Sequence, residues 1–277
     1  MNRYSEIIRP GFRIRFLYNL WKTLLKVDGL KGIIKGIDLY RAYEYPTVFH
    51  ILKNLSEDER GVILDIGSNR SVFVPFLALS LKGYFKRVIA TDVDDSSFGE
   101  SLNWQHKAKS KLSLKNLEVR FCDARTLMKS LPEYYKGNVN VITAISTLEH
   151  LESNGDIEAG QQIGQILAPS GLCIITLPFG KSFKCSERRG FFERVYDKKN
   201  LSERIVIPSK LKIISTRFFG AEGKISDLYS RMYTANSKIS YFLTRVIRIV
   251  LFPLFPYMIG EVSQDKAGGV LLVMKKL

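Results

Sequence analysis

The sequence is poor in cysteine, with three residues in a chain of 277. Cys122, Cys173 and Cys185 form no Cys-x-x-Cys motif and no Cys/His pairing. The odd count and the spacing argue against a disulfide framework and against a zinc site. We therefore expect no metal ion, and a reducing, cytoplasmic compartment.

Long apolar runs are also missing. The uncharged stretch from Ile249 to Ile259 is shorter than the ~20 residues that a membrane-spanning helix needs, and it contains two prolines. Near the N-terminus, Arg9, Arg13 and Arg15 interrupt any apolar core of a secretory signal. The sequence thus predicts neither a membrane span nor a signal peptide.

Acidic residues are few relative to basic ones: 27 against 42, for a formal net charge of +15. Such an excess predicts attraction to a polyanion, either nucleic acid or an anionic membrane surface at the inner face of the membrane. Much of the charge lies beside two apolar stripes at helical spacing. The first stripe comprises Phe16, Leu17, Leu20, Trp21, Leu24 and Leu25, and the second comprises Ile239, Phe242, Leu243, Val246, Ile247, Val250 and Leu251.

Three interpretations of the second stripe stay open. It packs on the domain or caps a substrate cleft, because apolar stripes at helical spacing usually mark a buried face. Alternatively it binds a membrane interface, since Arg245 and Arg248 lie opposite the apolar face and suit anionic headgroups. The third interpretation is a dimer contact, and the pattern predicts no oligomeric state.

What the sequence does contain is a series of apolar runs of strand length. They cover residues 61–66, 88–92, 117–123, 139–145 and 171–178, with helix-length segments between them. Two later runs, 212–219 and 268–274, have the same character. Such alternation predicts a doubly wound α/β sheet.

Three of these runs reach an acidic residue at or near their carboxyl ends. Asp65 is followed by Ile66 and Gly67, and a glycine there permits a tight turn close to a bound molecule. Asp92 follows Gly67 by a little more than the ~20 residues typical of a ribose-binding acid in a βαβ unit. Asp123 ends the third run. The pattern indicates a nucleotide-like ligand at this edge of the sheet.

In this order the segments resemble the Rossmann-like S-adenosylmethionine-dependent methyltransferases, from about Leu55 to the C-terminus. The resemblance implies a mostly parallel seven-stranded sheet whose last strand is antiparallel, lying between its neighbours. It divides the chain into an N-terminal helical extension, 1–55, and a methyltransferase domain, 56–277. Residues 223–264 then form a helical, apolar and basic insertion before the last strand, on the substrate face.

The resemblance also implies a cofactor, S-adenosylmethionine, and the residues that bind it. The first turn meets the methionine part, the acid after the second strand meets the ribose, and the acid after the third meets the adenine. The Ser-Thr-Leu-Glu-His run at 146–150 is common in the branch of the family that acts on small molecules. The expected cofactor-binding residues are Asp65, Gly67, Ser68, Asn69, Asp92, Val93, Asp123, Ala124, Ser146 and Glu149, with Asp94 as an alternative ribose ligand.

One departure concerns the first turn, where the family usually carries two more glycines. Asn69 and Ser71 occupy those positions. Asparagine tolerates a left-handed backbone better than most residues, so the turn is expected to form. The loss also fits a non-catalytic cofactor-binding module, which stays an alternative to an active enzyme.

Candidates for chemistry on the acceptor lie in three places. His150 is the expected general base for a hydroxyl acceptor, because an imidazole titrates near neutral pH, with a purely structural role as the alternative. Arg194 and Tyr196 follow the fifth run and are expected to bind substrate. Tyr43 and Glu44, the other two expected substrate-binding residues, belong to the run Tyr40–Pro46, which resembles a run in uncharacterised methyltransferases associated with bacterial cell-surface glycans. For Glu44, contact with the cofactor and capping of the following helix stay open as alternatives. Pro46 is expected to begin a helix over 47–55.

The sequence therefore predicts an S-adenosylmethionine-dependent methyltransferase that acts on a small-molecule, sugar or lipid-linked acceptor by O-methylation. An RNA methyltransferase using the basic surface is the alternative. Nucleic acid is the less favoured partner, because the chain has no Asn-Pro-Pro-Tyr or similar run for methylating an amino group.

Overall fold

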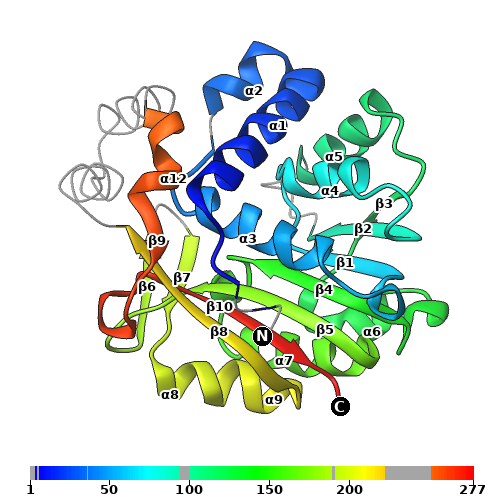
Figure 1. Cartoon of the computed structure of the whole chain (residues 1–277). Coiled ribbons are helices and arrows are strands. Elements are labelled where there is room, and N and C mark those ends of the chain that lie inside the picture. Colours follow the sequence, from blue (N-terminus) through cyan, green and yellow to red (C-terminus); the bar gives the residue numbers. More distant parts are fainter. Residues whose placement is uncertain (1–3, 5, 36, 94–99, 189–190, 222–250) are drawn as a thin grey trace.

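The computed structural model describes residues 4, 6–35, 37–93, 100–188, 191–221 and 251–277 (Figure 1). Within them an eight-stranded sheet has the order β3-β2-β1-β4-β5-β10-β8-β9. Its strands are β1 (Val62–Ile66), β2 (Arg87–Asp92), β3 (Leu117–Phe121), β4 (Val139–Ile145), β5 (Leu167–Pro178), β8 (Lys212–Ala221), β9 (Ile259–Glu261) and β10 (Gly269–Lys275). This arrangement confirms the Rossmann-like fold class.

The first five strands run parallel, and β10 runs antiparallel between β5 and β8. The expected antiparallel last strand is therefore confirmed. The predicted count of seven strands misses β9, a short strand that pairs antiparallel with the end of β8. Only three residues long, β9 has no apolar alternation that would mark it in the sequence.

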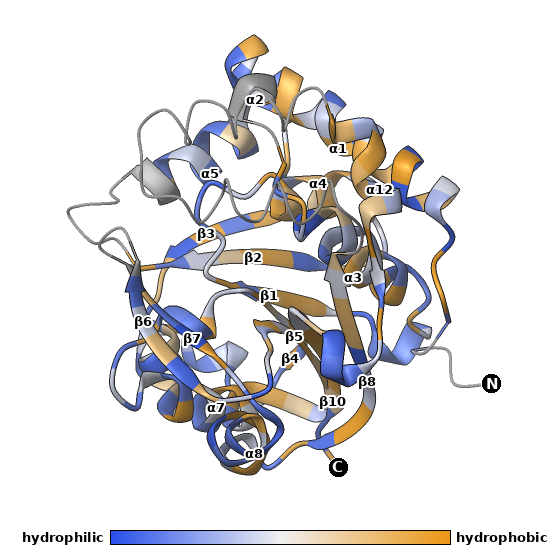
Figure 2. Cartoon of the chain, turned by 90° about the vertical axis from the view of Figure 1, so that its left-hand side faces the viewer, coloured by the Kyte–Doolittle hydropathy of each residue, from blue (hydrophilic) through white to orange (hydrophobic). Residues whose placement is uncertain are grey.

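Both faces of the sheet are covered, which explains why its strands read as nearly continuous apolar runs. Successive β1 residues, Ile63 and Leu64, are fully buried in separate hydrophobic clusters. One face carries α1 (Pro10–Asp28), α3 (Arg41–Lys53), α4 (Phe73–Ser80) and α5 (Glu100–Lys111) (Figure 1). The other carries α6 (Leu127–Ser130), α7 (Gly155–Ile166), α8 (Lys198–Leu201) and α9 (Ile207–Ser209) (Figure 1). The hydrophobic residues concentrate in the central strands and the inner sides of these helices (Figure 2).

The first apolar stripe lies on α1 and faces the protein. Phe16, Leu17, Leu20 and Leu24 are buried in the same cluster as α3 and α4. Trp21 stacks on Phe252 with ring centroids 4.0 Å apart, and so joins α1 to the segment before the last strand. Leu25 is 45% exposed, and the rest of the stripe forms core packing, as apolar residues at helical spacing usually do.

Helix α3 begins earlier than expected. It starts at Arg41 and contains Pro46 in its interior instead of starting after it. Pro46 is the sixth residue of α3, beyond the first turn, so its missing N–H removes one intrahelical hydrogen bond. Consequently Glu44 lies within the first turn of α3, on an element that reaches the carboxyl edge of the sheet.

Most of the second stripe lies outside the described residues. Residues 251–258 are described: they form a 3₁₀ turn and α12 (Phe255–Met258), with Phe252, Phe255 and Met258 buried. A short helix α2 (Leu30–Lys35) follows α1, and a separate hairpin pairs β6 (Lys184–Arg188) with β7 (Phe191–Val195). Among the described helices, none is both long and apolar enough to cross a bilayer.

Candidate cofactor and acceptor site

The turn after β1 forms the floor of the candidate site. Gly67 has a φ of 73°, and a Cβ there would lie 2.2 Å from Thr147 Cγ2, so only glycine fits. Asn69 has a φ of 40°, in the left-handed region that we predicted asparagine would tolerate. The turn therefore forms without the two further glycines.

A glutamine that we did not predict fastens this turn. Gln105, on α5, is fully buried, and its amide donates hydrogen bonds to the carbonyls of Ser68, Asn69 and Ser71. The Ser71 hydroxyl also lies 3.0 Å from the hydroxyl of Tyr45. Nothing in the sequence indicates that a glutamine of this polar helix contacts the turn. Gln105 thereby makes the turn rigid, which the residues of the turn do not do by themselves.

Asp65 lies beneath the turn and is 4% exposed. It accepts hydrogen bonds from the hydroxyls of Ser68 (2.7 Å) and Thr143 (2.6 Å). Burial raises the pKa of the Asp65 carboxyl to about 6, against the lowering effect of these two hydrogen bonds. Its main contacts hold the ends of β1 and β4 together at the site.

Asp92 lies at the end of β2 and faces the same turn. Its carboxylate accepts hydrogen bonds from the backbone N–H groups of Asn69 (2.5 Å) and Val93 (2.8 Å). These bonds fix the acid at the edge where a ribose would lie. Val93 is partly exposed beside it, and Asp94 lies outside the described residues.

Asp123 follows β3 and caps a short 3₁₀ turn that contains the buried Ala124. Arg125 donates to both carboxylate oxygens, at 2.6 to 3.0 Å. Burial acts to raise the pKa of Asp123, but the hydrogen bonds from Arg125 outweigh it and the pKa is lowered. Asp123 is therefore held in its charged form after β3, as the third acid along this edge of the sheet.

A buried acidic cluster lies at the end of β4. Glu44 and Glu149 are each 1% exposed, and Arg41 lies beside both. Glu44 accepts hydrogen bonds from Arg41 Nη1 (2.5 Å) and from the Ser146 hydroxyl (2.9 Å). The structure thus brings together Glu44 of α3 and the Ser146–Glu149 run, which are about 100 residues apart in the chain.

Glu149 has a buried Oε2 atom without a hydrogen-bond partner. Burial raises the pKa of its carboxyl to about 8, while a backbone hydrogen bond and Arg41 act in the opposite direction. At neutral pH this side chain is therefore mostly uncharged. A buried polar atom without a partner is costly, and such atoms often await a ligand. Arg41 was not among the site residues expected from the sequence, but it lies beside Glu44, which was.

His150 lies at the outer side of the cluster and is exposed. Its Nδ1 is 2.7 Å from the carbonyl oxygen of Phe192 in β7, and its Nε2 is 3.9 Å from Glu149 Oε1. Because a carbonyl can only accept, Nδ1 carries the proton of this hydrogen bond. In the neutral ring, Nε2 is then free to accept a proton.

All four expected substrate-binding residues are buried: Glu44 belongs to the acidic cluster, and the other three lie elsewhere in the interior. The Tyr43 ring stacks on Phe219 at 4.6 Å, and its hydroxyl donates to Glu261. Tyr196 is fully buried and donates to Asp156, and Arg194, 2% exposed, donates to main-chain carbonyls. Their polar atoms have partners within the protein, so the structure does not support a substrate-binding role for them; the sequence does not reveal this burial.

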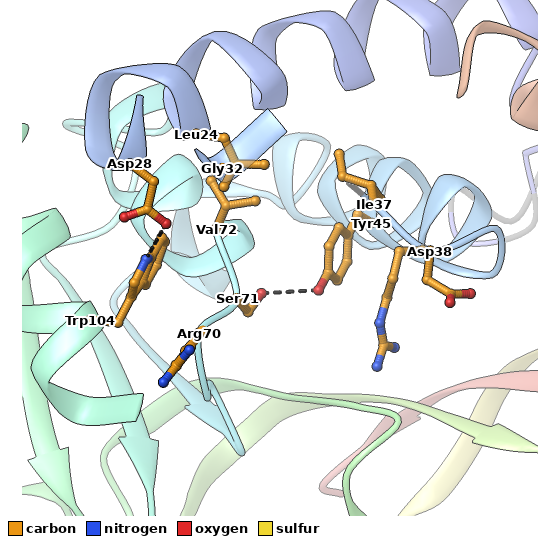
Figure 3. Close-up of a pocket in the computed structure, with 11 residues that line it drawn as sticks. Leu24, Asp28, Gly32, Ile37, Asp38, Tyr45, Arg70, Ser71, Val72 and Trp104 are labelled. Carbon is orange, nitrogen blue, oxygen red and sulfur yellow. Dashed lines mark hydrogen bonds between the residues drawn. The ribbon is translucent and has the colours of Figure 1, made fainter. Parts of the chain in front are cut away.

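A pocket of about 130 Å³ opens beside the turn (Figure 3). The N-terminal helices form one wall, the turn residues Arg70, Ser71 and Val72 form another, and Trp104 of α5 closes the end. Arg41 and Tyr45 line it from α3, so the pocket adjoins the acidic cluster. The Trp104 indole is fixed by a 2.7 Å hydrogen bond to Asp28 (Figure 3).

The fold can be compared with solved structures. A SAM-dependent methyltransferase from Methanosarcina mazei has a TM-score of 0.52 at 12% identity, over 82% of this chain and 96% of that one. A 1,6-didemethyltoxoflavin-N1-methyltransferase from Burkholderia thailandensis, solved with its substrate and S-adenosylhomocysteine, has a TM-score of 0.55 at 12% identity, over 98% and 92%. The chain has the fold of these methyltransferases. A geranyl diphosphate methyltransferase, solved with GPP and sinefungin, has a TM-score of 0.54 at 9% identity, over 84% and 78%.

Sequence comparisons add no relative. No protein-family model matches the chain, and no curated protein sequence matches it either. At 9–14% identity the structural likeness establishes the fold, and function has to be argued from the site.

Proposed function

We propose that the protein transfers a methyl group from S-adenosylmethionine to a hydroxyl of a small-molecule, sugar or lipid-linked acceptor. The observation that carries the proposal is the set of buried acids Asp65, Glu44 and Glu149 beside the Gly67 turn. Neighbouring buried carboxyls are unfavourable when charged unless a cation compensates them. Arg41 forms an ion pair with Glu44, and the raised pKa values of Asp65 and Glu149 indicate that it does not fully compensate the other two acids. S-adenosylmethionine supplies such charge, with a sulfonium and an ammonium, together with an activated methyl group.

The residues present fit this cofactor. The orphaned Oε2 of Glu149 offers a hydrogen-bond acceptor near the expected methionine end. The bare Gly67 leaves room for close approach to the backbone. Asp92 would bind the ribose, and Asp123 with Ala124 would meet the adenine, as the resemblance implies. Ser68, Asn69, Val93 and Ser146 complete the proposed cofactor-binding set.

His150 is the proposed base. Its side chain is exposed, its Nε2 lies 3.9 Å from Glu149 Oε1, and its Nδ1 is held by a carbonyl. A positioned imidazole can take the proton of an acceptor hydroxyl as the methyl group transfers. Glu44 is bonded to Arg41 and to Ser146 at the same edge, and it stays in the proposed substrate-binding set because its partner Arg41 lines the pocket.

The pocket of Figure 3 is the proposed acceptor site. Arg41 and Arg70 line it together with the acids Asp28 and Asp38, and Tyr45 and Trp104 bring aromatic surface. The arginines suit an anionic phosphate and the aromatic rings suit an apolar or sugar portion. His150 does not line the pocket, so the reacting hydroxyl would have to extend past Arg41 toward it. That a neighbour in fold acts on geranyl diphosphate supports, by analogy, an acceptor of this kind.

We also propose a peripheral contact with anionic membranes. Leu254 and Tyr257, before β9, are 45% and 64% exposed, and Lys22 and Lys26 are exposed on α1. Exposed apolar and basic groups together favour an anionic lipid interface. In liposome flotation, the wild-type protein should bind anionic vesicles and be released by salt. A Leu254→Ser/Tyr257→Ser variant that floats equally well would contradict this role.

Calorimetry tests cofactor binding. Titration with S-adenosylmethionine should give measurable heat, and Asp92→Ala should weaken binding at least tenfold, because a charge-assisted hydrogen bond contributes about 1.5–3 kcal/mol. Glu57→Ala, at an exposed position, serves as the control and should bind normally. Undiminished affinity of Asp92→Ala would refute the ribose assignment.

A transfer assay tests the acceptor class. The protein is incubated with methyl-labelled cofactor and either a membrane-lipid extract or total RNA. Label in the lipid fraction supports the proposal, whereas label in RNA alone supports the nucleic-acid alternative, which the net charge of +15 favours. Tight cofactor binding without transfer to either would indicate a non-catalytic module.

A further inference from the structure

The ring of His150 is held in one tautomer by the main chain of β7. Its Nδ1 lies 2.7 Å from the Phe192 carbonyl, which can only accept a hydrogen bond. A neutral imidazole has one N–H, so this contact places it on Nδ1 and leaves the lone pair on Nε2. Free histidine in water favours the opposite tautomer. The protein therefore selects the form in which Nε2 is the acceptor.

The position of the Phe192 carbonyl depends on a hairpin that is separate from the main sheet. Strand β7 pairs with β6 in a two-stranded sheet of its own. Beyond its end, the backbone of Tyr196 bonds to Pro178 and Gly180 after β5. That anchor lies four residues past Phe192, and a second contact lies closer to the carbonyl.

Arg194 provides this second contact. The side chain is 2% exposed, and its guanidinium donates to the carbonyls of Leu151 and Ser153, in the loop directly after His150. Its Nε lies 3.7 Å from the fully buried carboxylate of Asp156. Arg194 is two residues from Phe192 along β7, so one side chain joins the strand that carries the carbonyl to the loop that carries the histidine.

We propose that Arg194 is a positioning residue for methyl transfer: by clamping β7 to the 151–153 loop, it keeps the Phe192 carbonyl on His150 Nδ1 and presents Nε2 as the proton acceptor. The inference rests on the proposed function for its catalytic meaning. In that step the acceptor oxygen bonds to the methyl carbon and the carbon–sulfur bond breaks, with its electron pair left on sulfur. The hydroxyl proton passes to Nε2.

A second arginine provides a matched control. Arg204 bonds to Asp156 at 2.7 and 2.9 Å and to the Ser153 carbonyl at 2.9 Å. It thus shares the acid and the loop with Arg194 but comes from the segment after α8, not from β7. Replacing Arg204 disturbs the same buried carboxylate while leaving the tie between β7 and the loop in place.

Nitrogen NMR of the full-length protein tests the tautomer directly. The chain contains only His50, His106 and His150, so ¹⁵N-histidine labelling gives three ring systems, and His150→Gln identifies the third. In the wild-type protein at a pH where the ring is neutral, His150 should carry its proton on Nδ1. A proton on Nε2 in the wild-type protein overturns the inference without any variant.

The variants then test Arg194 itself. Arg194→Met should shift His150 toward the Nε2–H tautomer, and Arg194→Lys, which can reach one carbonyl, should give an intermediate population. Arg204→Met should retain the wild-type tautomer. An unchanged tautomer in folded Arg194→Met, or in Arg194→Lys if the methionine variant does not fold, overturns the positioning role. An equal shift in Arg204→Met also overturns it.

Kinetics separate this role from general loss of structure. Arg194→Lys should lower kcat by about tenfold, part of the 10²–10⁴ that a general base contributes, with little change in the KM for the cofactor. A matched loss in both parameters refutes the positioning role. Absence of methyl transfer by the wild-type protein would refute the proposed function, while the tautomer measurement would still stand or fall by itself.

Discussion

Replacing Glu149 by glutamine should make the cofactor-free protein more stable at alkaline pH. Burial raises the pKa of this carboxyl to about 8 in the folded protein, from an ordinary value of 4.5. The contribution of uncharged Glu149 to the free energy of unfolding is therefore fully present below about pH 4.5. It is lost as the pH rises to about 8, because the carboxyl ionises in the unfolded chain before it ionises in the folded protein. Each pKa unit corresponds to about 1.4 kcal/mol, so the full loss is about 5 kcal/mol.

Glutamine has the shape of the uncharged acid and does not ionise. Denaturant unfolding at pH 5, 7 and 9 should show the free energy of unfolding of wild-type protein falling relative to Glu149→Gln by about 2.5 kcal/mol between pH 5 and pH 7 and by about 4 kcal/mol between pH 5 and pH 9. Asp65 titrates in both proteins and cancels in this difference. Glu57→Gln, at an exposed position, is the control and should follow the wild type. Parallel pH profiles for wild type and Glu149→Gln would refute the reasoning.

The ionisation of Glu149 also predicts how the affinity for the cofactor depends on pH. A sulfonium beside Glu149 favours the ionised acid, so affinity for S-adenosylmethionine should rise between pH 6 and pH 9 and binding should release protons. S-adenosylhomocysteine lacks the sulfonium charge, and its affinity should depend less on pH. Calorimetry in buffers of different ionisation enthalpy measures the protons released. Glu149→Gln should abolish most of the difference between the two ligands, and an unchanged difference would contradict the placement of Glu149 at the methionine end.

Three further predictions concern the turn and the packing of the C-terminal segment. Gly67→Ala should destabilise the protein by about 1–3 kcal/mol or more in thermal or denaturant unfolding, because it adds a Cβ at positive φ and 2.2 Å from Thr147, and adding Thr147→Ser should recover part of the loss. Gln105→Ala should leave the fold intact by circular dichroism but lower cofactor affinity, because the turn loses hydrogen bonds worth about 0.5–1.5 kcal/mol each; normal affinity would show that the turn holds its shape unaided. Phe255→Ala should cost about 3–5 kcal/mol because Phe255 is fully buried, whereas Leu254→Ala, at a 45% exposed position, should cost less than about 1 kcal/mol; similar small losses would place this segment off the core.

The central parallel strands could be predicted from the sequence because both of their faces are covered and most of their residues must be apolar. β1 and β4 therefore read as mostly aliphatic runs, interrupted by Asp65 in β1 and by Asn140 and Thr143 in β4, and their carboxyl ends share one edge of the sheet. The positions of Asp65, Asp92 and Asp123 along this edge of the sheet follow from that topology alone. Positive φ at Asn69 could be predicted too, because backbone sterics are a local property of the residue.

What only the tertiary structure decided is which polar side chains face one another. Gln105 reaches the turn from α5, Glu44 meets Ser146 across 102 positions, and Phe192 meets His150 across 42. The sequence predicted that Arg194 and Tyr196 bind substrate, but in the interior their polar atoms contact Asp156 and main-chain carbonyls. Hydrophobic periodicity encodes which face of an element is buried. It carries no information on the hydrogen-bond partner of a buried polar group, because that partner is set by how distant segments pack.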